Sequence, residues 1–329
     1  MKKIWIGIGI AVILALLNGC GGGGGGPSIT PTSPPTSDEV SKLLPMEQNQ
    51  TLKYSWTVSS SINVNATGNF EIGQKRFQLG PIPLLIPLPK FLPQRDGTHN
   101  YSGSASAKVD GTLTNQVITT NSGVTFPANW PSNIVTVETD IGQGSGSATA
   151  TLSIDGKPQT ETHSIDLDPL LAREFLTNDS GKVQCWGMQT KNSDWGSIED
   201  FTADFVGSPL VLLQADKSSW DVVPHIDNDI FSADIKATLL GKGTYGGKEC
   251  YVVRYTLENF KLKTVTFQDV RITSYNLTSS YIDVWYAPNT GIVHSEGKMT
   301  LTAELSAPKY NAKGKITNLT ISFSTSLKQ

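Results

Sequence analysis

The chain has 329 residues, of which 17% are charged, with 26 lysine and arginine residues against 29 aspartate and glutamate residues. This slightly acidic balance argues against a nucleic-acid partner, because phosphate binding needs clustered lysine and arginine side chains. After the first apolar run, no segment is long and apolar enough to cross a membrane as a helix, which takes about 20 residues.

Residues 1–19 have the pattern of a secretory signal peptide. Lys2 and Lys3 form a positive n-region, and an uncharged apolar run follows over Ile4–Leu17, too short to span a bilayer. The run ends in Leu17-Asn18-Gly19-Cys20, which resembles the lipobox of bacterial lipoproteins. The resemblance implies cleavage before Cys20 and diacylation of its sulfur. The alternative is an ordinary signal peptide that happens to carry a cysteine.

The lipobox resemblance implies a protein of the bacterial cell envelope. Two or more acyl chains anchor a protein stably, where a single chain gives marginal binding. We therefore expect the mature chain, from Cys20 onward, to be attached to a membrane through its lipid without spanning it. The outer membrane is the expected one, and its periplasmic and surface faces both remain open. Without Lys2 and Lys3 the net charge falls from −3 to −5.

Residues 20–50 are expected to form a tether. Gly21–Gly26 is an unbroken glycine run, and Pro27–Pro35 combines proline with serine and threonine. Neither composition can bury a core, and both are typical of linkers.

From about Lys53 onward, apolar and polar residues alternate with a period of two. The first such run alternates Tyr54, Trp56, Val58, Ile62 and Val64 with Ser55, Thr57, Ser59, Ser61 and Asn63. Further runs lie at 101–109, 148–154, 299–305 and 319–323. Such alternation predicts half-buried antiparallel strands. Turn signals stand at Asp110-Gly111, Asp155-Gly156, Gly246-Gly247 and Pro288–Gly291.

Helix signals are scarce. Asp168 as N-cap with Pro169 at the first helical position predicts a helix through Leu176, and a second short helix is expected over 199–205. The predicted fold class is mainly β: one or more antiparallel sheets with one or two short helices. An N-terminal β region over 51–180 and a C-terminal β region over 181–329 form either two domains or one continuous domain.

The C-terminal part resembles a known group of lipoproteins. The stretch Tyr251–Thr256 and the later stretch Val284–Gly297, with its Ala-Pro-Asn-Thr-Gly turn, are similar to uncharacterised bacterial lipoproteins related to the LolA-like and LppX-like carriers. The resemblance implies a curved antiparallel sheet, a LolA-like half-barrel, whose concave face holds a lipid or acyl chain in some relatives. The shared turn is structural, since Pro288 fixes φ and Gly291 permits positive φ.

Sequence motifs of known catalytic or cofactor sites are either absent or lack the context that their function requires. Residues 241–246 fit G-x-G-x-x-G by letter, but a strand follows where a dinucleotide site needs a helix. Residues 295–298 fit S-x-x-K without its partner motifs, and no G-x-S-x-G is present. The four histidines stand far apart, and the acidic stretch 221–234 lacks the spacing of a calcium loop. We therefore expect no enzyme, no cofactor and no metal site.

Two further features carry specific predictions. Cys185 and Cys250 are the only cysteines besides the anchor, so in an oxidising compartment they form either a disulfide or two buried free thiols. Residues 80–94 interleave five prolines with apolar side chains, including Leu84, Leu85, Ile86 and Phe91. Proline excludes this segment from a central strand, so it is either a flap over the core or a loop that contacts membrane, lipid or a partner protein.

Two functions follow as hypotheses. The first is a membrane-anchored binding module for an apolar ligand or lipid, supported by the family resemblance and by the small inward residues of the strands, such as Gly103, Ala105 and Ala107. The second is a structural or surface-interaction lipoprotein without a ligand pocket, supported by the serine- and threonine-rich opposite faces.

Overall fold

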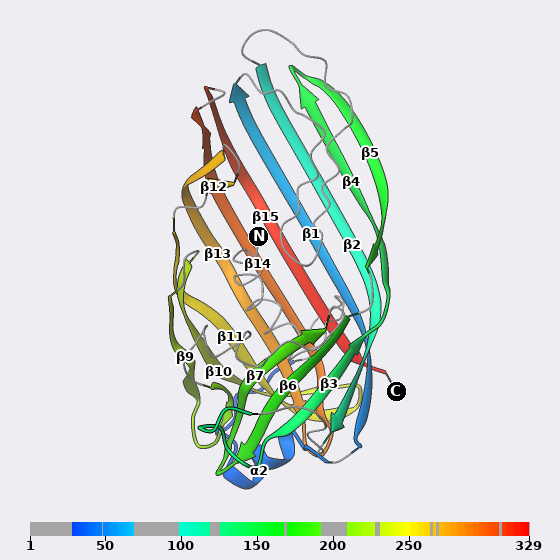
Figure 1. The fold of residues 1–329 in the computed structure, drawn as a ribbon, viewed down its shortest axis with the longest axis vertical. Coiled ribbons are helices and arrows are strands. Elements are labelled where there is room, and N and C mark those ends of the chain that lie inside the picture. The colour runs from blue at the N-terminus through cyan, green and yellow to red at the C-terminus, as the bar shows by residue number, and fades with distance from the viewer. Residues whose placement is uncertain are drawn as a thin grey trace.

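The computed structural model describes residues 28–47, 49–68, 99–118, 126–167, 170–191, 209–227, 231–263, 266–267, 270–308 and 311–328. These residues lie mainly in antiparallel strands, with one short helix, so the predicted mainly β class is confirmed (Figure 1).

The described part of the chain contains one helix and fifteen strands. In chain order they are α2 (Ser37–Leu43), β1 (Thr51–Gly68), β2 (His99–Ile118), β3 (Val135–Ile141), β4 (Gly144–Ile154), β5 (Lys157–Leu167), β6 (Leu170–Asp179), β7 (Lys182–Lys191), β8 (Leu210–Gln214), β9 (Ser219–Asp227), β10 (Phe231–Tyr245), β11 (Lys248–Leu262), β12 (Thr266–Phe267), β13 (Val270–Ala287), β14 (Gly291–Ala307) and β15 (Ala312–Leu327).

All fifteen strands belong to one nearly closed antiparallel sheet. Its order is β8-β7-β6-β3-β2-β1-β15-β14-β13-β11-β10-β9, with β4 and β5 added beside β2 and β12 beside β13. The two end strands, β8 and β9, are consecutive in the chain, and the Trp220 Nε1–H on β9 donates to the Val211 carbonyl on β8 at 2.9 Å. The sheet also runs without a break across residue 180, because β6 and β7 form a hairpin there.

The sheet has two different ends. At the end that carries α2, called the lower end, strands β3, β6–β8 and β9–β11 continue the sheet around the long strands (Figure 1). Toward the upper end only the long strands β1, β2, β13, β14 and β15 continue, flanked by β4, β5 and β12. The largest hydrophobic core lies at the lower end and includes Val40 and Leu43 of α2, both fully buried.

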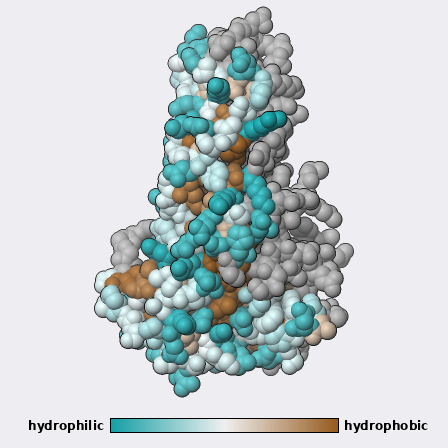
Figure 2. Space-filling model, turned by 90° about the vertical axis from the view of Figure 1, so that its left-hand side faces the viewer, coloured by the Kyte–Doolittle hydropathy of each residue, from teal (hydrophilic) through white to brown (hydrophobic). Residues whose placement is uncertain are grey.

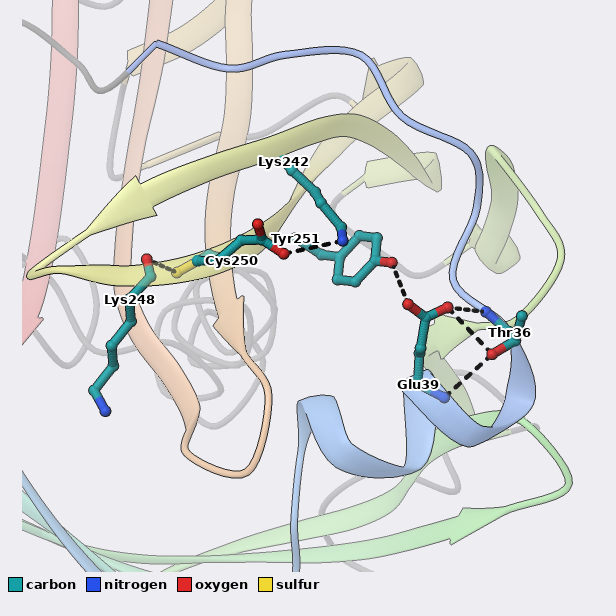
Figure 3. A network of polar contacts seen from close by, with 7 residues as sticks. Thr36, Glu39, Lys242, Lys248, Cys250 and Tyr251 are labelled. Atoms are coloured by element: carbon teal, nitrogen blue, oxygen red, sulfur yellow. Dashed lines mark hydrogen bonds and ion pairs between the residues drawn. The ribbon is translucent and has the colours of Figure 1, made fainter.

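The segment before β1 packs on the lower end, although composition predicted a tether as far as residue 50. Thr30 exchanges two backbone hydrogen bonds of 2.8 Å with Lys242 at the edge of β10. Helix α2 then begins with a capping box, in which Thr36 and Glu39 satisfy each other's backbone N–H groups. Glu39 Oε1 also accepts a 2.8 Å hydrogen bond from the Tyr251 hydroxyl (Figure 3).

One predicted helix is wrong. Residues 170–176 form strand β6, which pairs with β3 on one side and with β7 on the other. Leu176 packs in the lower core, while Phe175 packs on the opposite side against Trp130. Burial on both faces overrides the helix signal of Asp168 and Pro169, which themselves lie outside the described residues, as does the predicted helix over 199–205.

Three predicted turns are confirmed and one is wrong. Asp155-Gly156, Gly246-Gly247 and Pro288–Thr290 are turns between strands. Residues 241–245 therefore end strand β10 of a hairpin, and Gly246 begins its turn. Strand β2 instead runs straight through Asp110-Gly111. Gly111 is needed for close packing, because a Cβ there would come within 2.4 Å of the Trp56 ring on β1.

Replacing Leu43 by alanine tests whether α2 belongs to the folded body. Because Leu43 is fully buried in the lower core, Leu43→Ala is expected to lower the free energy of unfolding by about 3 kcal/mol. Lys42→Ala, on the exposed side of the same helix, is the control and is expected to change it by less than about 0.5 kcal/mol. Equal stability of both variants in chemical denaturation would show that this segment is a tether.

Candidate functional site

The candidate site is the apolar face of the long strands, called the inner face, which on β1 carries Tyr54, Trp56, Val58, Ile62 and Val64. Directly paired residues of neighbouring strands project from the same face of a sheet. The residues of neighbouring strands that pair with these β1 residues therefore belong to the same face. One row through Ile62 runs, from β13 to β5, through Leu277, Leu301, Leu319, Ile62, Ala105, Ala150 and Glu161.

Burial on the inner face changes along the strands. Toward the lower end, Tyr54 is 2% exposed and Trp56 is 7% exposed. Toward the upper end, Val58, Ile62 and Val64 are only half-buried. The inner-face residues of the neighbouring strands that are also half-buried are Leu277, Met299, Leu301, Ile316, Leu319 and Ile321. The upper inner face is thus apolar and still partly accessible.

The small inward residues have two different roles. Near the lower end they make room for aromatic rings, since a Cβ at Gly144 would come within 2.7 Å of Trp56 and one at Gly297 within 2.3 Å of Phe323. Higher on β2, a Cβ at Gly103 would meet only ordinary contacts at 3.6 Å. The glycines of the lower part therefore make room for aromatic rings. At Gly103 the nearest atoms among the described residues belong to Leu152 and Thr151.

Tyrosine hydroxyls tie strands together across the lower end. The Tyr54 hydroxyl on β1 donates to the Ile292 carbonyl on β14 at 2.9 Å. The Tyr255 hydroxyl on β11 donates to the Leu212 carbonyl on β8 at 2.7 Å and lies 2.8 Å from the Tyr286 hydroxyl. Since β8 and β11 are not neighbours in the sheet, the Tyr255 bond crosses the interior. Side chains therefore fill the lower end, in contrast to the upper inner face.

A buried carboxyl group is the most unusual feature of the lower core. Glu174 lies between the inward-facing Ala172 and Leu176 on β6 and is 4% exposed. Its Oε1 has no hydrogen-bond partner among the described residues. Burial raises the pKa of Glu174 to about 8, because the apolar surroundings disfavour the charged form. Glu174 is therefore protonated at neutral pH.

The two cysteines are separate in the structure. Cys185 lies in the lower core inside the sheet, whereas Cys250 lies in a different cluster with Val252 and Trp285. Both are buried free thiols, and each donates to a nearby carbonyl, Cys185 to Gly187 and Cys250 to Lys248. Of the two alternatives left open by the sequence, the structure contains the pair of free thiols and no bridge between them.

The other predicted site residues are not placed. Cys20, the predicted lipidation site, lies outside the described residues, as does the predicted apolar loop with Leu84, Leu85, Ile86 and Phe91. These residues stay predictions. Sequence reasoning missed Glu174 altogether; the only available signal was a single acidic residue at an inward position of an apolar segment, and that segment was assigned to a helix.

Within the described ranges, no three histidine, cysteine, aspartate or glutamate side chains gather as a metal site would require. The same part of the chain contains no helix with the length and apolarity needed to span a membrane. Comparison with known protein families gives no match, and comparison with curated proteins gives none either. The inner face must therefore be interpreted from its own geometry.

The pH dependence of stability tests the state of Glu174. Because its pKa is about 8 in the folded protein and about 4.5 when unfolded, only the unfolded chain loses this proton between these values, so stability falls as pH rises. The fall is on the order of 4 kcal/mol, and Glu174→Gln is expected to remove it from denaturation curves measured between pH 4.5 and pH 8.

The exposed Glu304 supplies the control, since Glu304→Gln is expected to leave the pH dependence of the wild type in place. A Glu174→Gln variant whose stability falls with pH as steeply as that of the wild type would show that Glu174 is ionised in the fold.

Proposed function

We propose that this protein is a lipid-anchored lipoprotein of the bacterial envelope whose upper inner face binds an apolar ligand, such as the acyl chain of a lipid. The observation that carries the proposal is the half-buried apolar surface around Val58, Ile62 and Val64. A fully packed core would bury these side chains, as it buries Tyr54 and Trp56. Burying the remaining apolar area under an acyl chain gains about 25 cal/mol per Å².

The shape of the sheet supports the same proposal. Apolar ligand sites are typically concave and lined by aliphatic side chains. The sheet is curved (Figure 1), and the residues of its inner face include Val58, Ile62 and Val64. The row through Ile62 is aliphatic across six strands and ends at the charged Glu161 on edge strand β5. Seen from the side in Figure 2, the flank of the molecule is mainly hydrophilic and is interrupted by hydrophobic patches.

The second candidate function is a structural or surface-interaction lipoprotein without a ligand. The observation that favours it is the filled lower end, where Tyr255 and Tyr286 cross the core with α2 packed beside them. In that case the half-buried aliphatic side chains would be ordinary surface of a sheet. Ligand binding distinguishes the two functions.

Binding of a fluorescent fatty acid to the purified protein tests the proposed site. The wild type is expected to bind the probe saturably. Ile62→Asp places a charge in the apolar row and is expected to weaken binding at least tenfold, about 1.4 kcal/mol or more. Ser61→Asp, the adjacent residue on the opposite face of β1, is the matched control and is expected to bind like the wild type.

Two results would contradict the binding function. Absence of saturable binding by the wild type would favour the structural alternative. If Ile62→Asp and Ser61→Asp weakened probe binding equally, the fatty acid would bind at a site other than the inner face.

The anchor has its own test. The n-region, the apolar run and the lipobox follow one another in the sequence order of a lipoprotein signal. They motivate the substitution Cys20→Ala, which is expected to abolish metabolic labelling by a fatty-acid probe. The same variant is expected to leave the membrane fraction, because two or more acyl chains supply the attachment. Labelling at the wild-type level in Cys20→Ala would disprove lipidation at this residue.

A further inference from the structure

The outer face of the long strands, opposite to the inner face, carries an array of hydroxyl and amide groups. From Ser55 upward on β1 it consists of uncharged residues: Ser55, Thr57, Ser59, Ser61, Asn63, Asn65 and Thr67. Lys53, nearer the lower end, lies on the same face. Because directly paired residues share a face, the array extends through Ser106 on β2 and Thr149 on β4 on one side of Ser61, and through Thr320 on β15 on the other.

Several of these groups are held in place by cross-strand hydrogen bonds. Thr149 and Thr162 are joined at 3.0 Å, and the next pair, Thr151 and Thr160, at 2.9 Å. Nearer the upper end, Thr67 donates to the Asn100 side chain at 3.1 Å. Short side chains on a paired sheet lose little further conformational freedom when a ligand binds.

The outer face is also hollowed in two places along the same strands. A hollow of about 410 Å³ is lined by residues that include Ser59, Ser61, Ser106 and Lys108. A second hollow, of about 750 Å³, is lined at the upper end by residues that include Asn65, Ser102, Lys313 and Lys315. From Ser59 to Thr67 the strand rises roughly 27 Å at 3.4 Å per residue, so one extended chain molecule can contact both hollows.

The charges in the hollows favour an anionic ligand. Lys313 and Lys315 project from the same face as Thr67 and Asn65, with which they pair. No ion pair among the described residues involves either lysine. Glu304, the cross-strand partner of Lys315, lines the same hollow, so two lysines and one carboxylate leave a net charge of +1 there. Lys108 is paired with Asp110 at 3.2 Å, so the unneutralised positive charge lies mainly at the upper end.

From these features we propose that the outer face is a binding site for an extended anionic saccharide chain. Serine and threonine hydroxyls both donate and accept hydrogen bonds, which matches the hydroxyl groups of sugars. Such groups also cost less to desolvate than charged ones. Lys313 and Lys315 then bind carboxylate or phosphate groups carried by the same chain.

The test uses the purified full chain and a labelled hexamer of galacturonic acid. The wild type is expected to bind it saturably and to bind the neutral maltohexaose at least tenfold more weakly. Lys313→Gln/Lys315→Gln is expected to weaken binding at least tenfold. Lys182→Gln/Lys217→Gln is the control and is expected to bind like the wild type, because both lysines are exposed and lie at the lower end, Lys182 at the start of β7 and Lys217 before β9.

A second pair of substitutions separates hydrogen bonding from charge alone. Ser59→Val/Ser61→Val removes two hydroxyls but keeps the charges and the strand, and it is expected to weaken binding at least fivefold. The proposal is overturned if the wild type shows no saturable binding, if hexaglutamate binds as tightly as the saccharide, or if the valine variant is unchanged. Each of these results leaves the apolar inner face unaffected, since it lies on the other side of the sheet.

Discussion

The pairing of β1 between β15 and β2 is the constraint on which the rest of the structure depends. This strand is paired along almost its whole length on both sides, so the first and last strands of the chain meet in the middle of the sheet. If β1 shifted by one residue against either neighbour, all its side chains would change faces. Trp56 and Ile62 would then point to the outer face, and Ser55 and Ser61 to the inner face. The register thus creates both proposed binding faces at once, one apolar and one rich in hydroxyl groups.

The edge strands of the sheet, whose unpaired backbone groups could pair with other chains, are protected in different ways at the two ends. At the lower end β8 and β9 approach each other and the core is filled, with α2 packed against it. At the upper end β5 remains an edge strand, and it carries Pro158 together with the inward-facing Glu161 and His163, whose side chains lie 3.2 Å apart. Proline and inward charges of this kind oppose pairing with other chains, and they also bound the apolar surface proposed for a ligand.

The strands could be predicted from the sequence because a period of two leaves little choice of local structure. The alternation around Tyr54 predicted the strand there, and the Asp155-Gly156 dipeptide predicted the turn. The curvature of the sheet was implied only by the resemblance to LolA-like carriers. Strand β6 could not be recognised, because burial on both faces removes the alternation that marks a strand. Leu176 packs in the lower core, while Phe175 packs on the opposite face with Trp130 and Trp186. Helix α2 was hidden in a segment rich in proline, serine and threonine, although its capping box at Thr36 and Glu39 is visible in the sequence.

The candidate site was predictable only in outline. Alternation identified the apolar face, but it could not show that Trp56 is buried while Ile62 remains accessible, because that difference depends on where the shorter strands end. Glu174 escaped notice for a related reason, since its burial arises from the closure of the lower end by β6, β7 and β8. The alternation in the sequence thus shows which face of the sheet each side chain occupies. Which part of a face is packed depends on where distant strands close the sheet.

Mass spectrometry of lipids that co-purify with the protein tests the central claim most directly. The protein is isolated from envelope membranes, and lipids are extracted without cleaving the anchor, so that only non-covalent ligand is collected. The account predicts a defined apolar species near one molecule per chain, lost in Ile62→Asp and retained in Ser61→Asp. A wild-type protein that yields no such species, or the same yield from Ile62→Asp, would contradict it.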